Sequence, residues 1–365
     1  MRSIGWGVLL LLIPMGDVGA ADKLKMLVVS SYHREYRWAQ QTNTGFCKGL
    51  LEFGYLDNQA QADEYTKTDA VESSTAIIKK LWMDTKRKSR VEDMTAATRQ
   101  ITEAAEAFAP DLIFLGDDNA ANYIGNHFLD TKIPVVFWGV NNTPVKYGLL
   151  DSAEHPGHNV TGVYQSGYYT ESLKFLKTLV PKAQTFAILS DDTETGRSHL
   201  KAIEALARDG VLPLTLVESV ATNKYEEWQQ RALALQEQVD AFYVAQYTAL
   251  KDANGQYIPA EEVAKWYLGH IRIPEATNME QFVQHGLLSA ANDSGENQGH
   301  EAVKIAHDIL NGAAPATYAA RAPARGASMV NRRRAAVLGI VLTPEMGIEQ
   351  YIEEAQALPD AATVQ

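Results

Sequence analysis

Residues 111–139 read DLIFLGDDNAANYIGNHFLDTKIPVVFWG, and this stretch holds two apolar runs, residues 111–118 and 133–139, on either side of a polar segment. Each run is continuously hydrophobic rather than alternating, which is typical of a parallel strand that helices cover on both faces. Asp or Asn side chains follow each run within two residues of a glycine. The stretch therefore predicts two buried parallel strands with polar groups at their carboxyl ends.

The same pattern recurs along the chain. Residues 25–31, 185–192 and 239–247 are further apolar runs, and residues 287–291 form a weaker one. Amphipathic helical periodicity lies between them, at residues 95–108, 172–179, 197–207 and 301–310. This alternation of strands and helices predicts an α/β fold with open, doubly wound parallel sheets.

Two strand–helix series are visible, and a length of 365 residues fits two domains better than one. We expect two lobes joined by a hinge that the chain crosses more than once. The polar or Pro/Gly-rich crossing candidates are residues 141–161, 252–261 and 313–328. The expected boundaries are residues 21–143 plus 271–312 for lobe one, 144–270 plus 313–345 for lobe two, and 346–365 for a C-terminal helix or tail.

The amino terminus has the layout of a secretory signal peptide. Arg2 precedes an apolar run at residues 8–13, and small residues follow at positions 18–21. A retained anchor is the alternative, but Gly16 and Asp17 interrupt the run short of the roughly 20 residues that span a bilayer. We expect residues 1–20 to be cleaved after Ala20, which leaves a periplasmic protein without membrane insertion.

Charge and cysteine content restrict the partners. The formal net charge is −12, which argues against nucleic acid because a phosphate backbone needs a basic footprint. The basic residues at 79–90 are interpreted as a solvated face rather than a functional patch. The single cysteine, Cys47, lies far from the cleavage region, so it neither carries a lipid there nor forms an intrachain disulfide.

Polar side chains at strand ends are the candidate ligand contacts, because open α/β sheets bind ligands at the carboxyl ends of their strands. Each one alone could simply cap a helix, but four such ends favour a shared cleft. Oxygen acceptors suit an ammonium group, and helix amino termini suit a carboxylate, so an amino acid or similar zwitterion fits. The candidates are Asp117, Asp118, Asn119, Asn141, Asn142, Asp191 and Asp293.

Aromatic residues extend this candidate site. Tyr32 and His33 directly follow the first strand, and we expect them to face the ligand. Tyr36 and Trp38 either line the same cleft or pack the next helix against the lobe. Tyr164 and Tyr247 are expected to contribute from the second lobe.

Motifs for phosphate, dinucleotide, nucleophilic or zinc chemistry are absent from the sequence, so no cofactor and no enzymatic activity are expected. His155 and His158 are too few for a metal site. A hydrolase using Asp117, Asp118 or Asp191 with His33 as base is the remaining catalytic alternative. Adjacent residues at a strand end point in different directions, which weakens that alternative.

Residues 111–139, followed by VNNTPVKYGLL (140–150) and NVTGVYQ (159–165), resemble the ABC-transporter substrate-binding proteins of the type I periplasmic binding fold. SMVNRRRAAVLGIVLTP (328–344) is similar to the closing segment of that family. The opening SSYHREYRWAQQTNTGF (30–46) resembles a subgroup that also occurs as extracytoplasmic sensor modules.

The resemblance implies a protein whose lobes close around a ligand, often an amino acid and sometimes an aromatic one, and deliver it to a membrane permease. A ligand-sensing adaptor for a two-component signalling kinase is the alternative. Asp117, Asp118 and Asn119 stand where the family commonly has small hydroxyl residues, and a Thr-Asp-Pro turn is replaced by NNTP at residues 141–144. Asp293 matches an acidic position of the family, so the resemblance implies a polar ligand that can differ from the usual one.

Overall fold

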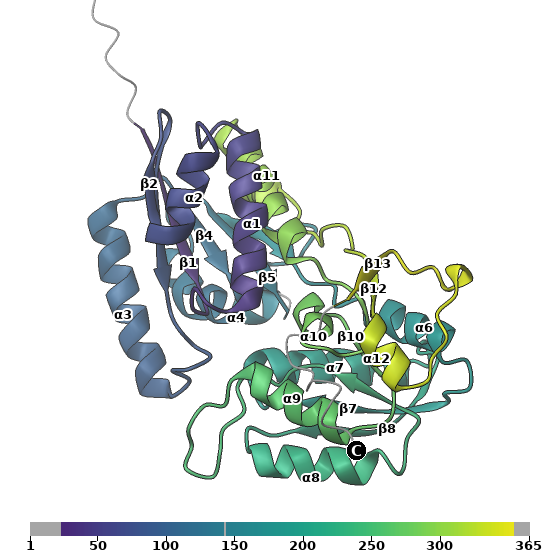
Figure 1. The fold of residues 1–365 in the computed structure, drawn as a ribbon. Helices are drawn as coiled ribbons and strands as arrows, with labels where there is room; N and C mark the ends of the chain where they lie inside the picture. Colours follow the sequence, from purple (N-terminus) through teal and green to yellow (C-terminus); the bar gives the residue numbers. More distant parts are fainter. Residues whose placement is uncertain (1–22, 142–143, 354–365) are drawn as a thin grey trace, which may run out of the picture.

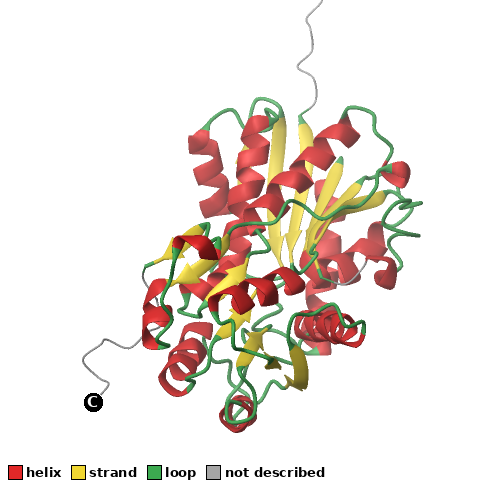
Figure 2. Ribbon diagram, turned by 90° about the vertical axis from the view of Figure 1, so that its right-hand side faces the viewer, coloured by secondary structure: helices red, strands yellow, loops and turns green. Residues whose placement is uncertain are grey.

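The computed structural model describes residues 23–141 and 144–353 and divides them between two lobes, each built on its own sheet (Figures 1 and 2). The sheet of lobe one has the strand order β2-β3-β1-β4-β5-β6, and all neighbours are parallel except β2 and β3. Its strands are β1 (Leu24–Ser30), β2 (Ala70–Glu72), β3 (Ala76–Trp82), β4 (Leu112–Gly116), β5 (Val135–Val140) and β6 (Val160–Tyr164).

Alternate residues of these strands face two separate helical layers. In β1, Met26 and Val28 pack with α1, α2 and α11, whereas Leu27 and Val29 pack with α3 and η1. Burial on both faces explains the continuous apolar runs in the sequence. The helical segments of lobe one are α1 (Arg37–Glu52), α2 (Gln59–Thr68), α3 (Val91–Phe108), α4 (Asp117–Ala120), η1 (Ala121–Gly125), α5 (Asn126–Phe128), η2 (Pro144–Tyr147), α11 (Gly295–Leu310) and η3 (Pro315–Thr317).

Helix α11 comes late in the chain yet packs along α1 (Figure 1). Gly45 permits this close approach, because a Cβ atom at that position would lie 1.8 Å from the backbone oxygen of Glu296. The chain thus returns to lobe one at α11, before its last strands join lobe two.

The sheet of lobe two repeats the plan of lobe one. Its order is β13-β12-β11-β10-β9-β7-β8, so β8-β7-β9-β10-β11 has the same parallel arrangement as β3-β1-β4-β5-β6. Strand β12 runs antiparallel to β11, and β13 pairs parallel with β12 to form the edge of the sheet. The strands are β7 (Thr185–Ser190), β8 (Thr215–Ala221), β9 (Ala241–Val244), β10 (Glu275–Thr277), β11 (Ser289–Ala291), β12 (Ser328–Asn331) and β13 (Gln350–Ile352).

Helices cover both faces of this second sheet as well (Figure 2). In each sheet the strand order reverses beside the first strand, at β1/β4 and at β7/β9, which is where α/β proteins bind ligands. The helices of lobe two are α6 (Tyr169–Leu179), α7 (Glu194–Arg208), α8 (Tyr225–Leu235), α9 (Ala260–His270), α10 (Glu280–Gln284), α12 (Arg332–Val337) and η4 (Pro344–Met346).

Three crossings join the lobes, after β6, after β11 and before β12. They contact one another. The backbone N–H of Gly167 donates to Asp293, and the hydroxyl of Tyr168 donates to the carbonyl of Pro323 at 2.8 Å. The prediction of two open α/β lobes with a multi-crossing hinge is therefore confirmed.

The expected boundaries need correction. Residues 160–164 form β6 in the sheet of lobe one, and residues 275–291 form β10, α10 and β11 in lobe two rather than lobe one. Residues 252–261 do not cross between lobes, since they lead from β9 to α9. Residues 350–352 form an edge strand, not a helix. The predicted signal peptide, Asn142 and residues 354–365 lie outside the described residues.

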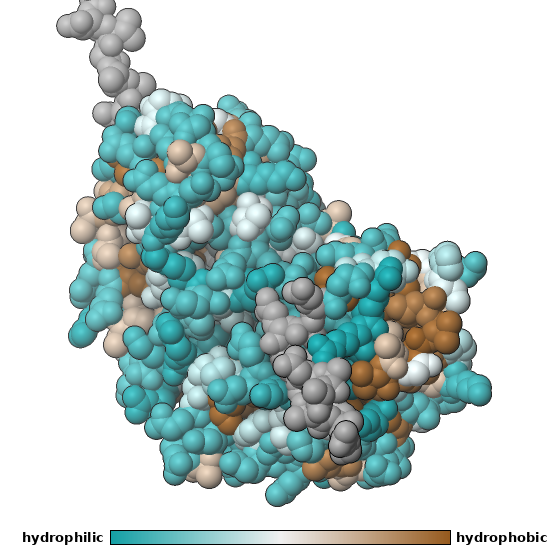
Figure 3. Space-filling model, in the orientation of Figure 1, coloured by the Kyte–Doolittle hydropathy of each residue, from teal (hydrophilic) through white to brown (hydrophobic). Residues whose placement is uncertain are grey.

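The surface is mostly hydrophilic in the view of Figure 3, and apolar side chains gather at the right-hand edge of lobe two. Val337 at the end of α12 and Val341 after it are 55% and 77% exposed. Within residues 23–141 and 144–353, no helix combines the length and the apolar character that a bilayer crossing requires.

Candidate functional site

Asp118 and Asn141 lie side by side where β4 and β5 end. The Asp118 carboxylate accepts hydrogen bonds from both nitrogens of Asn141, the backbone N–H at 3.1 Å and the side-chain Nδ2 at 2.9 Å. The Tyr147 hydroxyl donates to the same carboxylate at 3.2 Å. Because Nδ2 is held by Asp118, the amide oxygen of Asn141 points elsewhere, and it is buried without a hydrogen-bond partner.

Asp117 holds an aromatic side chain in place. Its Oδ1 atom accepts from the Trp38 indole N–H at 2.7 Å. Burial raises the pKa of Asp117 well above its usual range, and nearby Asp118 raises it further. The close contact also requires Gly139, because a Cβ atom there would lie 2.5 Å from Asp117 Oδ1. Asp117 therefore positions Trp38 and is not among the residues that line the interlobe cavity, although its Oδ2 atom is buried without a hydrogen-bond partner.

Three aromatic side chains of lobe one gather at the interlobe surface. The rings of Tyr32 and Tyr36 meet edge to face with centroids 4.8 Å apart, and Trp38 is 2% exposed beside them. The Lys86 ammonium lies 4.8 Å from the Tyr32 ring and 5.2 Å from the Tyr36 ring. Burial raises the pKa of Tyr32 well above 10, so its phenol stays protonated and can donate.

Lobe two supplies polar groups from the first turns of α7. Thr195 lies 3.4 Å from the Tyr32 hydroxyl and 3.5 Å from Asp118, so it bridges the lobes. His199, one turn later, shares a hydrogen bond of 2.8 Å with the Tyr169 hydroxyl through Nδ1. Burial lowers the pKa of His199 to about 3, so the ring is neutral. Its Nε2 atom is buried without a partner.

Gln165 comes from the first hinge crossing. Its Nε2 atom donates to the carbonyl of Gly139 at 3.0 Å, which leaves the buried Oε1 atom without a partner. Gln165, Asn141 and His199 thus each present one unsatisfied polar atom. Buried polar atoms normally have partners, and such a group suggests a ligand.

These groups line one cavity between the lobes. Its volume is about 10 Å³, room for a single water-sized sphere, so the lobes stand closed. One continuous cluster of buried apolar side chains spans the two lobes beside this cavity. It contains Tyr32, Tyr36 and Trp38 of lobe one together with Trp228 and Tyr247 of lobe two. The cavity is lined by Tyr32, Tyr36, Trp38, Asn141, Gln165, Thr195, His199, Gln246 and Met279.

Of the residues predicted from the sequence, Tyr32 and Asn141 line this cavity, and Asp117 and Asp118 support it from behind. Asn119 donates a hydrogen bond through Nδ2 to the Thr85 hydroxyl and lies in an outer part of the cleft. Asp293 belongs to the hinge, where it accepts from Gly167 and Gln298.

Four other predicted residues lie outside the lining. His33 bonds to Glu35 at 3.1 Å, and Asp191 accepts from Thr193 at 2.6 Å at the start of α7. Tyr164 packs with the core of lobe one. Tyr247 stacks on Phe282 inside lobe two and bonds to His285.

Most of the polar side chains that line the cavity were not predicted from the sequence. Gln165 follows β6 directly, so the strand-end rule could have identified it. Thr195 and His199 face the cavity only because α7 begins at the lobe interface, and Met279 lies before a short helix without any distinctive motif. For Tyr36 and Trp38 the sequence permits two roles, lining the cleft or packing the next helix, and in the structure both side chains line the cavity.

The arrangement is suited to binding. Its lining offers aromatic faces, neutral acceptors and hydroxyl donors from both lobes. The carboxylates proposed for hydrolysis bond to Trp38, Asn141 and Thr193, and the proposed base His33 bonds to Glu35. Among the described residues, no three His, Cys, Asp or Glu side chains are arranged to hold a metal ion.

Two α/β lobes with a shared hinge and a cavity between them define a periplasmic-binding-protein fold. Residues 72–350 match the family described as ABC transporter substrate binding protein, and the chain belongs to that family. A tyrosine-binding protein of Clostridioides difficile strain R20291 is 22% identical over 280 residues, which are 76% of this chain and 70% of that protein.

Solved structures share the fold. The ABC domain from Streptococcus pneumonia in complex with L-Trp is 19% identical, with a TM-score of 0.69 over 90% of this chain and 100% of that one. A ligand-free, open substrate binding protein with adhesive properties from Clostridium difficile is 22% identical, with a TM-score of 0.65 over 90% of this chain and 99% of that one.

Proposed function

We propose that the protein binds a neutral aromatic amino acid, such as L-tyrosine or L-tryptophan, between its lobes in the periplasm. The observation that carries this proposal is the meeting of three aromatic side chains with the unpartnered atoms of Asn141, Gln165 and His199. The amide oxygens would accept from the ligand ammonium, and the rings would pack on its side chain. The names of the tyrosine-binding relative and the L-Trp complex support the same class.

The cavity of about 10 Å³ is too small for such a ligand, so the lobes must separate to admit it. Binding would then favour closure through contacts made to both lobes at once. Delivery to an ABC permease is the proposed use of the closed complex, and uptake of radiolabelled amino acid by cells lacking this protein would test it. Uptake at the wild-type rate would favour the sensor role instead.

Calorimetry with L-tyrosine, L-tryptophan, L-phenylalanine and L-leucine tests the binding proposal. We expect at least one aromatic amino acid to bind more tightly than leucine. Asn141→Ala should weaken that affinity 10- to 100-fold, since a hydrogen bond to a charged group is worth about 1.5–3 kcal/mol. Asn122→Ala, in the outer cleft, is the matched control and should change affinity less than twofold. Equal affinities in both variants, or no heat with any aromatic amino acid, would refute the proposal.

A further inference from the structure

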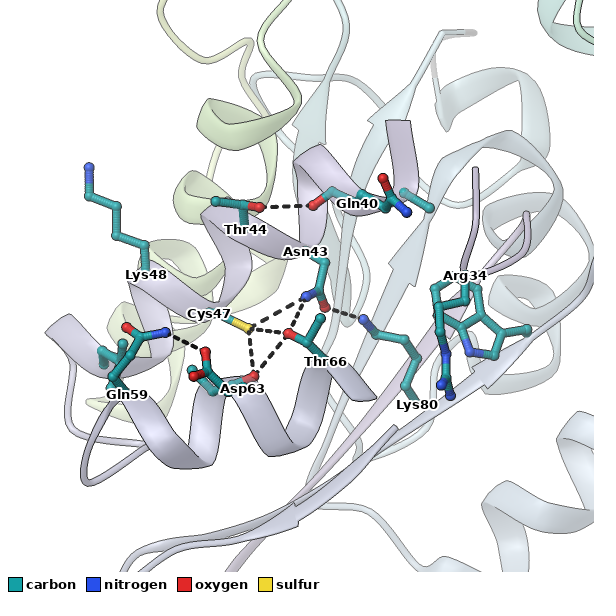
Figure 4. Close-up of a pocket in the computed structure, with 14 residues that line it drawn as sticks. Arg34, Gln40, Asn43, Thr44, Cys47, Lys48, Gln59, Asp63, Thr66 and Lys80 are labelled. Atoms are coloured by element: carbon teal, nitrogen blue, oxygen red, sulfur yellow. Dashed lines mark hydrogen bonds between the residues drawn. The ribbon is translucent and has the colours of Figure 1, made fainter. Parts of the chain in front are cut away.

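A second cavity lies in lobe one, away from the hinge, between α1, α2 and β3 (Figure 4). Its volume is about 630 Å³, which is within the range of small-molecule sites. Apolar atoms of Ala39, Leu51, Ala62 and Trp82 form part of the wall. The interlobe cavity shares none of these lining residues.

Lys80 is the unusual group in this cavity. It is 8% exposed, although a lysine ammonium is normally solvated. The interpretation of the basic residues at 79–90 as a solvated face is therefore wrong for Lys80, and also for Lys86, which is 3% exposed. Figure 4 shows its side chain reaching from β3 toward Asn43 of α1, whose Oδ1 atom accepts a hydrogen bond from it. The ammonium also lies 4.6 Å from the Tyr65 ring and 5.1 Å from the Trp82 ring.

Asn43 is the one hydrogen-bond acceptor for Lys80 among the described residues, so two of its three N–H donors lack one. No carboxylate of the described chain lies within ion-pair distance of it. A buried ammonium without a counter-ion is costly, and burial lowers the pKa of Lys80 to about 8. An anion placed beside it would remove that cost.

The charged side chains around the cavity also favour an anionic ligand. Lys48 and Arg34 join Lys80 in the lining, and Asp63 is the single carboxylate there. Asp63 accepts from Gln59 at 2.9 Å, and Arg34 pairs with Asp69. Asn43 Nδ2 donates to the Thr66 hydroxyl at 2.9 Å and to Cys47 Sγ at 3.7 Å, and Thr66 donates to the Ala62 carbonyl. The two N–H groups of Lys80 without an acceptor therefore remain the donors available to an anion.

We propose that this cavity of lobe one is a second binding site, for a small organic carboxylate with an apolar body. The carboxylate accepts hydrogen bonds from the two N–H groups of the Lys80 ammonium that Asn43 does not use. The apolar body lies along Trp82 and the small side chains of α1 and α2. The site is independent of the amino-acid site between the lobes, so its failure and the failure of that proposal are distinguishable.

Binding of benzoate and phenylacetate, measured by ligand-observed NMR titration of the full chain at pH 7, tests this inference. Benzyl alcohol is the neutral probe of matched size. We expect both carboxylates to bind and Lys80→Met to weaken their affinity at least tenfold, while Lys48→Met, at the exposed rim, changes it less than threefold. Thr44→Trp, an exposed position that would place a ring across the cavity, should also abolish binding without affecting the fold.

Two further readouts separate this site from the interlobe one. Asn141→Ala should leave benzoate binding unchanged, and Lys80→Met should leave the affinity for aromatic amino acids unchanged. Benzoate binding should fall as the pH rises through about 8, as Lys80 loses its proton beside Cys47, Asp69 and Arg34. Absence of carboxylate binding, equal binding by folded Lys80→Met, or equal binding of benzyl alcohol would overturn the proposal.

Discussion

Asn141 illustrates how a single side chain is prepared for a ligand. Asp118 holds both of its nitrogens, so rotation of the amide is blocked and its oxygen faces the interlobe cavity. The Asp118 carboxylate is thereby used for positioning, and the acceptor presented to the ligand is neutral. A neutral oxygen avoids the desolvation cost that a carboxylate would have when the lobes close over it.

Asp293 gives a residue-level prediction about pH. Burial raises its pKa to about 6, from 3.8. The folded state therefore holds this proton more tightly than the unfolded state, and the stability that this provides is present below about pH 4 and lost as the pH rises through 6. At pH 8 the buried carboxylate costs up to about 3 kcal/mol.

Asp293→Asn should therefore raise the free energy of unfolding at pH 8 by up to about 3 kcal/mol and change it little at pH 4. The amide oxygen still accepts from Gly167, and loss of the long 3.4 Å hydrogen bond from Gln298 makes this value an upper limit. Urea denaturation of both chains at the two pH values measures this, with the exposed Glu237→Gln as control. A variant that is less stable at pH 8 would contradict the assignment.

Sequence reasoning found part of the site at this scale. Tyr32 and Asn141 directly follow strands, so their position could be predicted from the end of an apolar run. His199 and Thr195 lie in the first turns of a helix, and nothing local distinguishes their inward face from an ordinary buried face. Tyr247 was predicted to contact ligand because it follows β9, but its ring turns into the core of lobe two and stacks on Phe282.

Among the elements, the C-terminal segment is fixed to lobe two by a buried ion pair. The Arg334 guanidinium of α12 donates through Nε and Nη2 to the Glu275 carboxylate of β10, both at 2.9 Å, and both residues are fully buried. The Glu275 carboxylate also accepts from the backbone N–H of Leu288. Helix α12 is therefore tied to both β10 and the approach to β11.

Arg334→Met should destabilise the protein by about 3–5 kcal/mol, because it leaves the Glu275 carboxylate buried without its partner. Adding Glu275→Gln in the same chain should recover most of this loss. Arg332→Met is the control, since its pair with Glu353 is exposed and should be worth less than about 1 kcal/mol. Chemical denaturation of the wild type, the two single variants and the double variant measures their free energies of unfolding. A double variant no more stable than Arg334→Met would contradict the ion-pair account.

Each predicted apolar run corresponds to a strand, because burial on both faces produces runs that are easy to recognise, but β3, β8 and the helices α2, α8 and α9 were not predicted. Assignment of elements to lobes was less successful. Residues 275–291 were given to lobe one, although β10 pairs with β9 and completes lobe two. The two sheets have the same order and similar strands, so sequence periodicity alone cannot say which sheet a strand joins. Contacts far apart in the chain, such as α1 with α11, decide it.

At the scale of the whole molecule, the lobes meet through a mixture of apolar and weak polar contacts. The Tyr36 hydroxyl lies 3.4 Å from the Thr248 hydroxyl and accepts a hydrogen bond from Gln281 Nε2 at 3.2 Å. The Lys251 ammonium donates to the Ser89 hydroxyl at 3.0 Å. Three crossings that contact one another provide a hinge about which these contacts can form and break together. Ligand that touches both lobes would shift this equilibrium toward closure.

Spin labels attached at Glu92→Cys in α3 and Gln230→Cys in α8 would follow this motion. Double electron–electron resonance measures the distance between the two labels. Both positions are exposed, whereas the native Cys47 is buried. We expect a broad distance distribution without ligand and a narrower, shorter one with saturating L-tyrosine or L-tryptophan. An unchanged distribution at saturation would show that binding does not close the lobes.

The central claim is that an aromatic amino acid occupies the space between the lobes, and a crystal structure of the protein with L-tyrosine or L-tryptophan tests it most directly. The account predicts electron density for the ligand between Trp38 and α7, with its ammonium group near the amide oxygens of Asn141 and Gln165. Density for the amino acid only elsewhere, such as beside Lys80 in lobe one, with an empty interlobe cavity, would contradict it.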